Sequence, residues 1–143
     1  MSGVIGMGIY PTDSEENIAY KILHTNSRVI FVSDAKKQEK VLKLHEAGML
    51  KFPDGSQKLN TVVCWGPDAK KLECTNLRFM TWSEFKEIGD ASSSKEAEKR
   101  SAKTKPGNVA FIIYTSGNYN KRKSVKLSHL RDNGSAKRVY DFS

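Results

Sequence analysis

Three short runs of apolar, largely β-branched residues constrain the fold of this 143-residue chain more than any other feature of its sequence. The runs are RVIFVS (residues 28–33), TVVCW (61–65) and VAFIIY (109–114). Each is too short to span a membrane and has the continuous apolar character of a strand buried on both faces. Segments with helical periodicity lie before and between the first two runs. This alternation predicts an α/β fold with a mainly parallel sheet flanked by helices.

Capping signals predict where the helices begin and end. The first helix is expected to begin at one of two capping boxes, Thr12–Glu15 or Asp13–Glu16. The second is expected to follow Asp34 as its N-cap and to stop at Gly48. A third, short helix is expected after the capping box Thr81–Glu84.

The distribution of charge separates the C-terminal third from the rest of the chain. Residues 1–94 contain 12 Lys/Arg and 12 Asp/Glu, whereas residues 95–143 contain 12 Lys/Arg and four Asp/Glu, which accounts for the net charge of +8. This asymmetry indicates either an anionic partner or a solvated basic tail. Aromatic and basic residues are not interleaved, so we do not expect a nucleic acid as the ligand. Within this stretch, residues 90–107 are rich in Ser, Lys and Glu and predict a flexible linker.

Composition also indicates the cellular setting. The N-terminus lacks a basic start followed by a long apolar stretch, so no secretory signal is expected. Cys64 and Cys74 are the only cysteines, and their spacing favours two reduced thiols over a disulfide framework or a metal knuckle. We therefore expect a cytoplasmic protein without a transmembrane segment, and leave peripheral association with an intracellular membrane open.

The loop after the third apolar run carries the chemistry of a phosphate site. Ligands of parallel α/β sheets bind at the carboxyl ends of the strands, so this loop is the natural candidate. Thr115 and Ser116 offer hydroxyl donors, and Gly117 allows close backbone approach to an anion. Lys123 adds a mobile positive charge. The string is not a P-loop, because it contains no GxxxxGK[ST] pattern.

A longer stretch resembles a known family. AFIIYTSG followed by K.V.LSH, over residues 110–129, resembles the phosphate-loop signature YTSGTTGxPKGVxLSH of adenylate-forming (AMP-binding) enzymes. Residues 3–44 and 79–89 are similar to the region before that loop in long-chain acyl-CoA synthetases of the bubblegum type. The resemblance implies that residues 1–133 are part of the N-terminal AMP-binding domain, with a partial three-layer arrangement, and that residues 134–143 form a tail.

The resemblance also implies a reaction and a set of contacts. Members of the family activate a fatty acid with ATP and Mg²⁺, release pyrophosphate, and transfer the acyl group to CoA. Thr115, Ser116, Gly117 and Lys123 would contact the ATP phosphates. The strands around the loop would be held by a frame of five residues: Tyr114, Val125, Leu127, Ser128 and His129. The resemblance assigns no catalytic residue and no metal ligand to this chain.

Several positions depart from the family pattern. Asn118-Tyr119-Asn120 replaces Thr-Thr-Gly, Arg122 replaces Pro, and Ser124 replaces Gly. The family's downstream adenine-, ribose- and acyl-binding segments have no counterpart after residue 129. We therefore expect a truncated fragment of a long-chain fatty acid–CoA ligase that is inactive alone, a pseudoenzyme with weak affinity for ATP or another polyphosphate. The alternative is a non-catalytic anion-binding or protein-interaction module that uses the basic C-terminal third.

Overall fold

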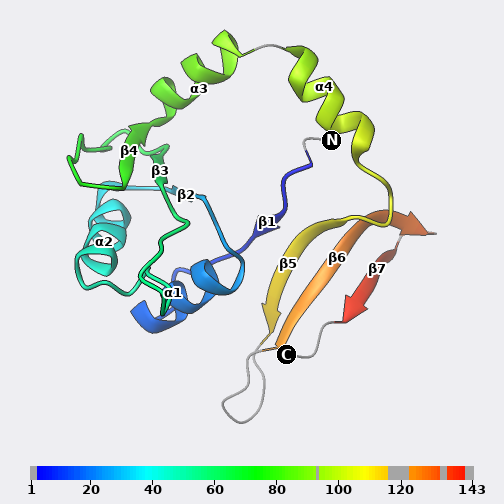
Figure 1. The fold of residues 1–143 in the computed structure, drawn as a ribbon, viewed down its shortest axis with the longest axis horizontal. Helices are drawn as coiled ribbons and strands as arrows, with labels where there is room; N and C mark the ends of the chain where they lie inside the picture. The colour runs from blue at the N-terminus through cyan, green and yellow to red at the C-terminus, as the bar shows by residue number, and fades with distance from the viewer. Residues whose placement is uncertain (1–2, 93, 116–122, 133–134, 141–143) are drawn as a thin grey trace. The chain divides into compact units, whose positions relative to one another are not determined.

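The computed structural model of the chain describes residues 3–92, 94–115, 123–132 and 135–140. The chain divides into two compact units. Residues 9–92 form one, which we call the central unit, and residues 1–8 with 93–143 form the other, the terminal unit. Each unit has its own sheet (Figure 1). The central unit is electrically neutral, and the terminal unit holds the net charge of +8.

The central unit contains the parallel sheet that the sequence predicts. Its three strands lie in the order β2-β3-β4, and all neighbours are parallel. Register places Ile30 beside Val62 and Val62 beside Phe79. The strands are β2 (Val29–Val32), β3 (Thr61–Cys64) and β4 (Arg78–Thr81).

Helices cover both faces of this sheet, which gives the central unit the expected partial three-layer arrangement. On one face, α1 (Glu15–His24) and α2 (Ala35–Glu46) share a hydrophobic core with β2 and β3. On the other face, α3 (Trp82–Ala91) places the Phe85 ring 5.3 Å from that of Phe31, measured between ring centroids. Leu50 and Leu59 from the α2–β3 connection complete the first core and are almost fully buried.

Burial on both faces holds for β3 but not for β2. Val62, Val63 and Cys64 are fully buried, as the continuous apolar run predicts. In β2, burial alternates: Ile30 and Val32 are buried, whereas Val29 and Phe31 are exposed. The expectation was wrong for β2 because this strand lies at the edge of the three-stranded sheet, where α3 covers the second face only in part.

The helix caps follow the sequence with one exception. Asp34 caps α2 by accepting from Lys37 N, and Thr81 and Glu84 form the reciprocal capping box of α3. Gly48 ends the α2 region with a φ of +72°, which glycine adopts without strain. The N-cap of α1 is Ser14, whose Oγ accepts from Asn17 N at 3.3 Å, so neither predicted capping box forms at that position.

The terminal unit contains a mixed four-stranded sheet in the order β1-β5-β6-β7. The strand β1 runs parallel to β5, whereas β5, β6 and β7 form an antiparallel meander (Figure 1). The sequence predicted that the third apolar run belongs to the same parallel sheet as the first two, but it lies in this separate mixed sheet. It is also not buried on both faces as predicted, because Ala110 and Tyr114 are buried whereas Phe111 and Ile113 are exposed. The strands are β1 (Gly6–Met7), β5 (Val109–Thr115), β6 (Lys123–Asp132) and β7 (Ser135–Tyr140).

Two segments form regular structure where the sequence indicates a linker and a tail. Ser94–Lys103 forms the helix α4 inside the expected linker 90–107, and Ser135–Tyr140 forms β7 inside the expected tail 134–143. None of the residues of α4 is buried. Its helicity is consistent with its composition, because Ala, Glu, Lys and Arg are good helix formers, and Glu96 pairs with Arg100 one turn later.

The structure thus has the α/β fold class expected from the sequence. No helix in the described ranges is long and apolar enough to cross a membrane.

Candidate functional site

The predicted phosphate loop connects two paired antiparallel strands of the terminal unit. The last residue of β5, Thr115, lies opposite the first residue of β6, Lys123. The next pair along the ladder is Tyr114 with Ser124. The two strand ends that residues 116–122 connect therefore lie side by side.

The second residue pair of the ladder, counted from the loop, is buried. Tyr114 and Ser124 are each 5% exposed, and Ser128 further along β6 is also buried. Ser124 stands where the family signature has glycine, and the strand accommodates it. No fully buried side-chain nitrogen or oxygen lacks a hydrogen-bond partner in the part of the chain that the structure describes. Serine in place of glycine at position 124 therefore leaves β5 and β6 paired at this position.

The far end of the hairpin is anchored by Asn108. Its carbonyl oxygen accepts from His129 N at 3.0 Å, and its side-chain Oδ1 accepts from Lys105 N at 2.7 Å. The ladder shifts register between Val109 and Phe111, where β5 has a bulge or similar irregularity. These contacts link the start of β5 to the end of the LSH string.

The predicted contact residues divide between described and undescribed positions. Thr115 is exposed at the end of β5, and Lys123 begins β6. Ser116 and Gly117 lie outside the described residues, as do the altered positions 118–120 and 122. The five residues of the expected frame all lie in the two paired strands, as the resemblance implies: Tyr114 in β5 and Val125, Leu127, Ser128 and His129 in β6.

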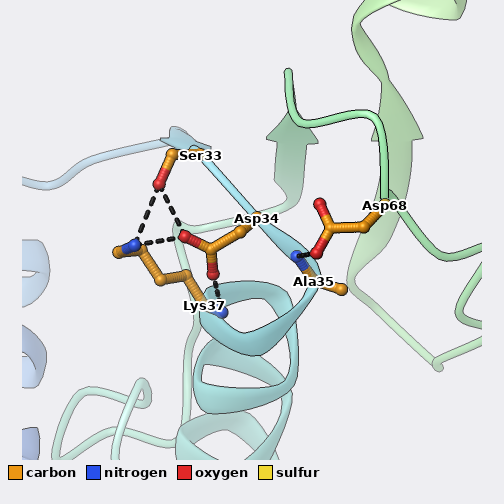
Figure 2. A network of polar contacts seen from close by, with 5 residues as sticks. All are labelled: Ser33, Asp34, Ala35, Lys37 and Asp68. Carbon is orange, nitrogen blue, oxygen red and sulfur yellow. Dashed lines mark hydrogen bonds and ion pairs between the residues drawn. The ribbon is translucent and has the colours of Figure 1, made fainter.

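The carboxyl end of the parallel sheet, the other place where an α/β fold would bind an anion, is already occupied by carboxylates. At the N-terminus of α2, Lys37 N donates to Asp34 Oδ1 at 2.9 Å and Ala35 N donates to Asp68 Oδ2 at 3.1 Å (Figure 2). A helix N-terminus attracts anions through these N–H groups. Since two side chains of the protein use them, this helix end is not a second phosphate site.

Hydrogen bonds to Asp34 also keep its carboxylate ionised. The side chains of Lys37 and Ser33 donate to it, and these bonds together with that from Lys37 N lower its pKa to about 2 (Figure 2). The negative charge at this position therefore persists over the whole physiological pH range.

Metal-binding groups are not gathered anywhere in the described ranges. No set of three or more His, Cys, Asp or Glu residues there is placed to hold a metal ion, and Cys64 and Cys74 are free thiols. The donors at the hairpin are hydroxyl, amide and ammonium groups, which suit a polyphosphate and not a bare cation.

Comparison with known sequences agrees with the resemblance. The family model described as AMP-binding enzyme matches residues 1–138. The long-chain-fatty-acid–CoA ligase ACSBG2 of Rattus norvegicus is 30% identical over 129 residues, which is 90% of this chain and 18% of that protein. ACSBG2 of Homo sapiens is 26% identical over 129 residues, with the same coverage. ACSBG2 of Xenopus laevis is 27% identical over 128 residues, covering 90% of this chain and 16% of that protein.

These matches bear on the extent of the family region and on the length of the chain. The family match continues to residue 138, so part of the segment that the sequence indicates as a tail is included in it. The chain spans less than a fifth of the length of the curated relatives it matches.

Proposed function

The chain belongs to the AMP-binding enzyme family, and we propose that it supplies the ATP-phosphate-binding hairpin of a long-chain fatty acid–CoA ligase. The observation that carries this proposal is the register of β5 and β6. It brings Thr115 and Lys123, two of the residues to which the family's signature assigns phosphate contacts, opposite each other.

In this proposal each of the four contact residues of the hairpin makes a different contact with the phosphates. Thr115 and Ser116 donate hydroxyl hydrogen bonds, and Gly117 lets backbone N–H groups approach the phosphate oxygens. Lys123 contributes a charge-assisted hydrogen bond. The net charge of +8 on the terminal unit attracts the polyanion to this end of the sheet.

The partners follow from the family. ATP enters with Mg²⁺ bound to its phosphates, and a long-chain fatty acid and CoA are the other substrates of the ligase. Adenylation by ATP makes the carboxyl group of the fatty acid reactive toward the thiol of CoA. The residues of this chain bind and orient the phosphates in that reaction. Peripheral association with a membrane is part of the proposal, because long acyl chains partition into lipid, and vesicle flotation tests it.

We further propose that these 143 residues do not turn over substrate by themselves. The signature lacks two hydroxyl residues and two glycines at positions 118–120 and 124. Extra charge at Lys121 and Arg122 attracts phosphate but does not restore the donor geometry. A misplacement of about 1 Å can reduce a rate by roughly 100-fold. Weak ATP binding without catalysis is the expected behaviour.

Titration of Mg²⁺-ATP into the 143-residue chain by calorimetry tests the binding site. The Lys123→Ala variant should weaken binding about tenfold, the effect of one charge-assisted hydrogen bond. The matched control is Lys99→Ala, which removes the same charge from the exposed helix α4 of the same unit. Equal weakening in both variants would mean that only net charge attracts ATP and would contradict the site.

A second experiment tests the effect of the altered loop. The five-fold variant Asn118→Thr, Tyr119→Thr, Asn120→Gly, Arg122→Pro and Ser124→Gly restores the family pattern and should bind Mg²⁺-ATP more tightly, although it carries one positive charge fewer. Weaker binding by this variant would show that charge outweighs geometry. Formation of acyl-CoA by the unaltered chain would overturn the proposal that it is inactive.

The family match favours the ligase assignment over a non-catalytic anion-binding or protein-interaction module. The basic terminal unit is the feature that motivates the alternative. Binding of unrelated polyanions as tight as binding of ATP, with the same steep salt dependence, would support it.

A further inference from the structure

A small apolar cavity lies in the central unit, in a part of the molecule that the phosphate hairpin does not use. Its volume is about 270 Å³, and it is lined by residues of the segment 9–11, α1, β2, α2 and Trp65. Its floor consists of core side chains that are at most 9% exposed: Ile18, Ile30, Val41 and Leu44. A molecule that entered the cavity would therefore contact the hydrophobic core directly.

Two aromatic residues of the lining, Tyr10 and Trp65, are unusually exposed. Tyr10 is 54% exposed and Trp65 55%. Single exposed apolar residues are ordinary on protein surfaces, but two that line the same opening indicate a binding site. Flat rings of this kind pack well against the faces or edges of an aromatic ligand.

The charged groups of the lining are all positive. Among the described residues that line it, Lys37 and Lys40 are the only charged ones, and none is a carboxylate. Lys37 is neutralised by Asp34. Lys40 Nζ donates to the backbone carbonyl of Asp13 at 3.1 Å and forms no ion pair with any residue in the described part of the chain. An ammonium group has three donors, so Lys40 can bind an anion without breaking this bond.

We propose that this cavity binds a compact aromatic monoanion, with its ring on the apolar floor and its acidic group on Lys40. Charge complementarity with Lys40 determines the sign of the ligand, and the aromatic side chains favour a ring. Small-molecule sites usually occupy about 300–1,000 Å³, so this cavity suits a small ligand and not a nucleotide or a long acyl chain. The inference does not depend on ATP binding at the hairpin, because its residues belong to the central unit.

Calorimetric titration of the 143-residue chain with 2-naphthoate tests the proposal, with the neutral 2-naphthalenemethanol as a comparison. The chain should bind 2-naphthoate saturably at one site and the alcohol about tenfold more weakly, because the alcohol cannot pair with an ammonium. The Lys40→Gln variant should reduce the affinity for 2-naphthoate to that for the alcohol.

Two further variants distinguish a built site from general attraction. Lys36→Gln removes the same charge from an exposed position of α2 outside the lining and should leave the affinity unchanged. Ile9→Trp places a ring over the lining from a partly exposed position and should abolish binding while the melting temperature stays near that of the unaltered chain. Non-saturable uptake, equal affinity for acid and alcohol, or equal loss in Lys36→Gln and Lys40→Gln would overturn the proposal.

Discussion

The side-chain amide of Gln38 makes two reciprocal hydrogen bonds with the backbone of Lys70. Gln38 Nε2 donates to the carbonyl oxygen of Lys70 at 3.1 Å, and Lys70 N donates to Gln38 Oε1 at 2.9 Å. Gln38 is fully buried, although glutamine is usually exposed. These two hydrogen bonds hold the connection after β3 against α2, in the same reciprocal pattern that pairs two strands of a sheet.

Replacing Gln38 by Leu should lower the free energy of unfolding by about 2 kcal/mol. The substitution removes both hydrogen bonds, each of which contributes about 0.5–1.5 kcal/mol. Urea denaturation followed by circular dichroism measures the change. The neighbouring Glu39→Gln variant is the control, because the Glu39–Lys70 pair is exposed and should contribute little. Similar stability in Gln38→Leu and Glu39→Gln would contradict this role of the amide.

The ion pair between Lys21 and Asp13 provides a second test of stability. The two atoms Nζ and Oδ2 lie 2.6 Å apart, and the side chains are 3% and 11% exposed. Asp13 Oδ2 also accepts from Tyr10 N at 2.7 Å, so the carboxylate orders the turn before α1. Lys21→Met should destabilise the chain by about 3 kcal/mol or more, because a buried charge loses its partner.

A double substitution separates this pair from simple loss of packing. Lys21→Met with Asp13→Asn removes both charges, and it should be less destabilising than the sum of the two single variants. Thermal denaturation of the four proteins completes the cycle. Additive effects would mean that the two side chains do not stabilise each other.

Acid should weaken the cap of α2 in a definite pH range. The pKa of Asp34 is lowered from 3.8 to about 2, chiefly by the hydrogen bond from the Lys37 side chain. Since the folded state holds the proton less tightly than the unfolded state, the stabilisation is fully present above about pH 4. It is then lost as the pH falls toward 2.

The Asp34→Ser variant tests this range, because serine keeps an N-cap oxygen but does not ionise. The difference in unfolding free energy between the unaltered chain and the variant should shrink between pH 4 and pH 2. Urea denaturation at several pH values measures it. A difference that stays constant over this range would show that the charge of Asp34 adds nothing to the cap.

Local signals in the sequence predict much of the central unit. The N-cap Asp34, the capping box of Thr81 with Glu84 and the stop at Gly48 all form as expected, because each depends on contacts within a few residues. The start of α1 is wrong by one or two residues. Thr12, Asp13 and Ser14 can each cap a helix. Because the Asp13 carboxylate pairs with Lys21, it is not the N-cap, and Ser14 caps α1 instead.

Sheet membership could not be predicted from local signals. An apolar run such as residues 109–114 predicts a strand, but the neighbours of that strand depend on pairing with distant parts of the chain. β5 pairs with the two-residue β1, which has no strand signal of its own. The aromatic residues of the cavity lining were missed for the same reason, because Tyr10 and Trp65 are far apart in sequence. Within the hairpin, the family pattern assigned phosphate contacts to Thr115 and Lys123, and the structure places these two residues opposite each other at the ends of β5 and β6.

Two glycines of the central unit should respond to alanine in opposite directions. A Cβ at Gly66 would lie 2.2 Å from the carbonyl oxygen of Ser33 and 2.7 Å from Asp68 Oδ1, so Gly66→Ala must displace backbone. We expect a loss of about 2 kcal/mol or more from this overpacking. Gly89 lies in α3, and an alanine methyl group there would have nothing within 4 Å, so Gly89→Ala should stabilise the chain by about 0.5–1 kcal/mol. Urea denaturation of both variants measures the signs. A stabilising Gly66→Ala would mean that Ser33 and the Gly66–Asp68 turn do not approach as closely as the structure has them.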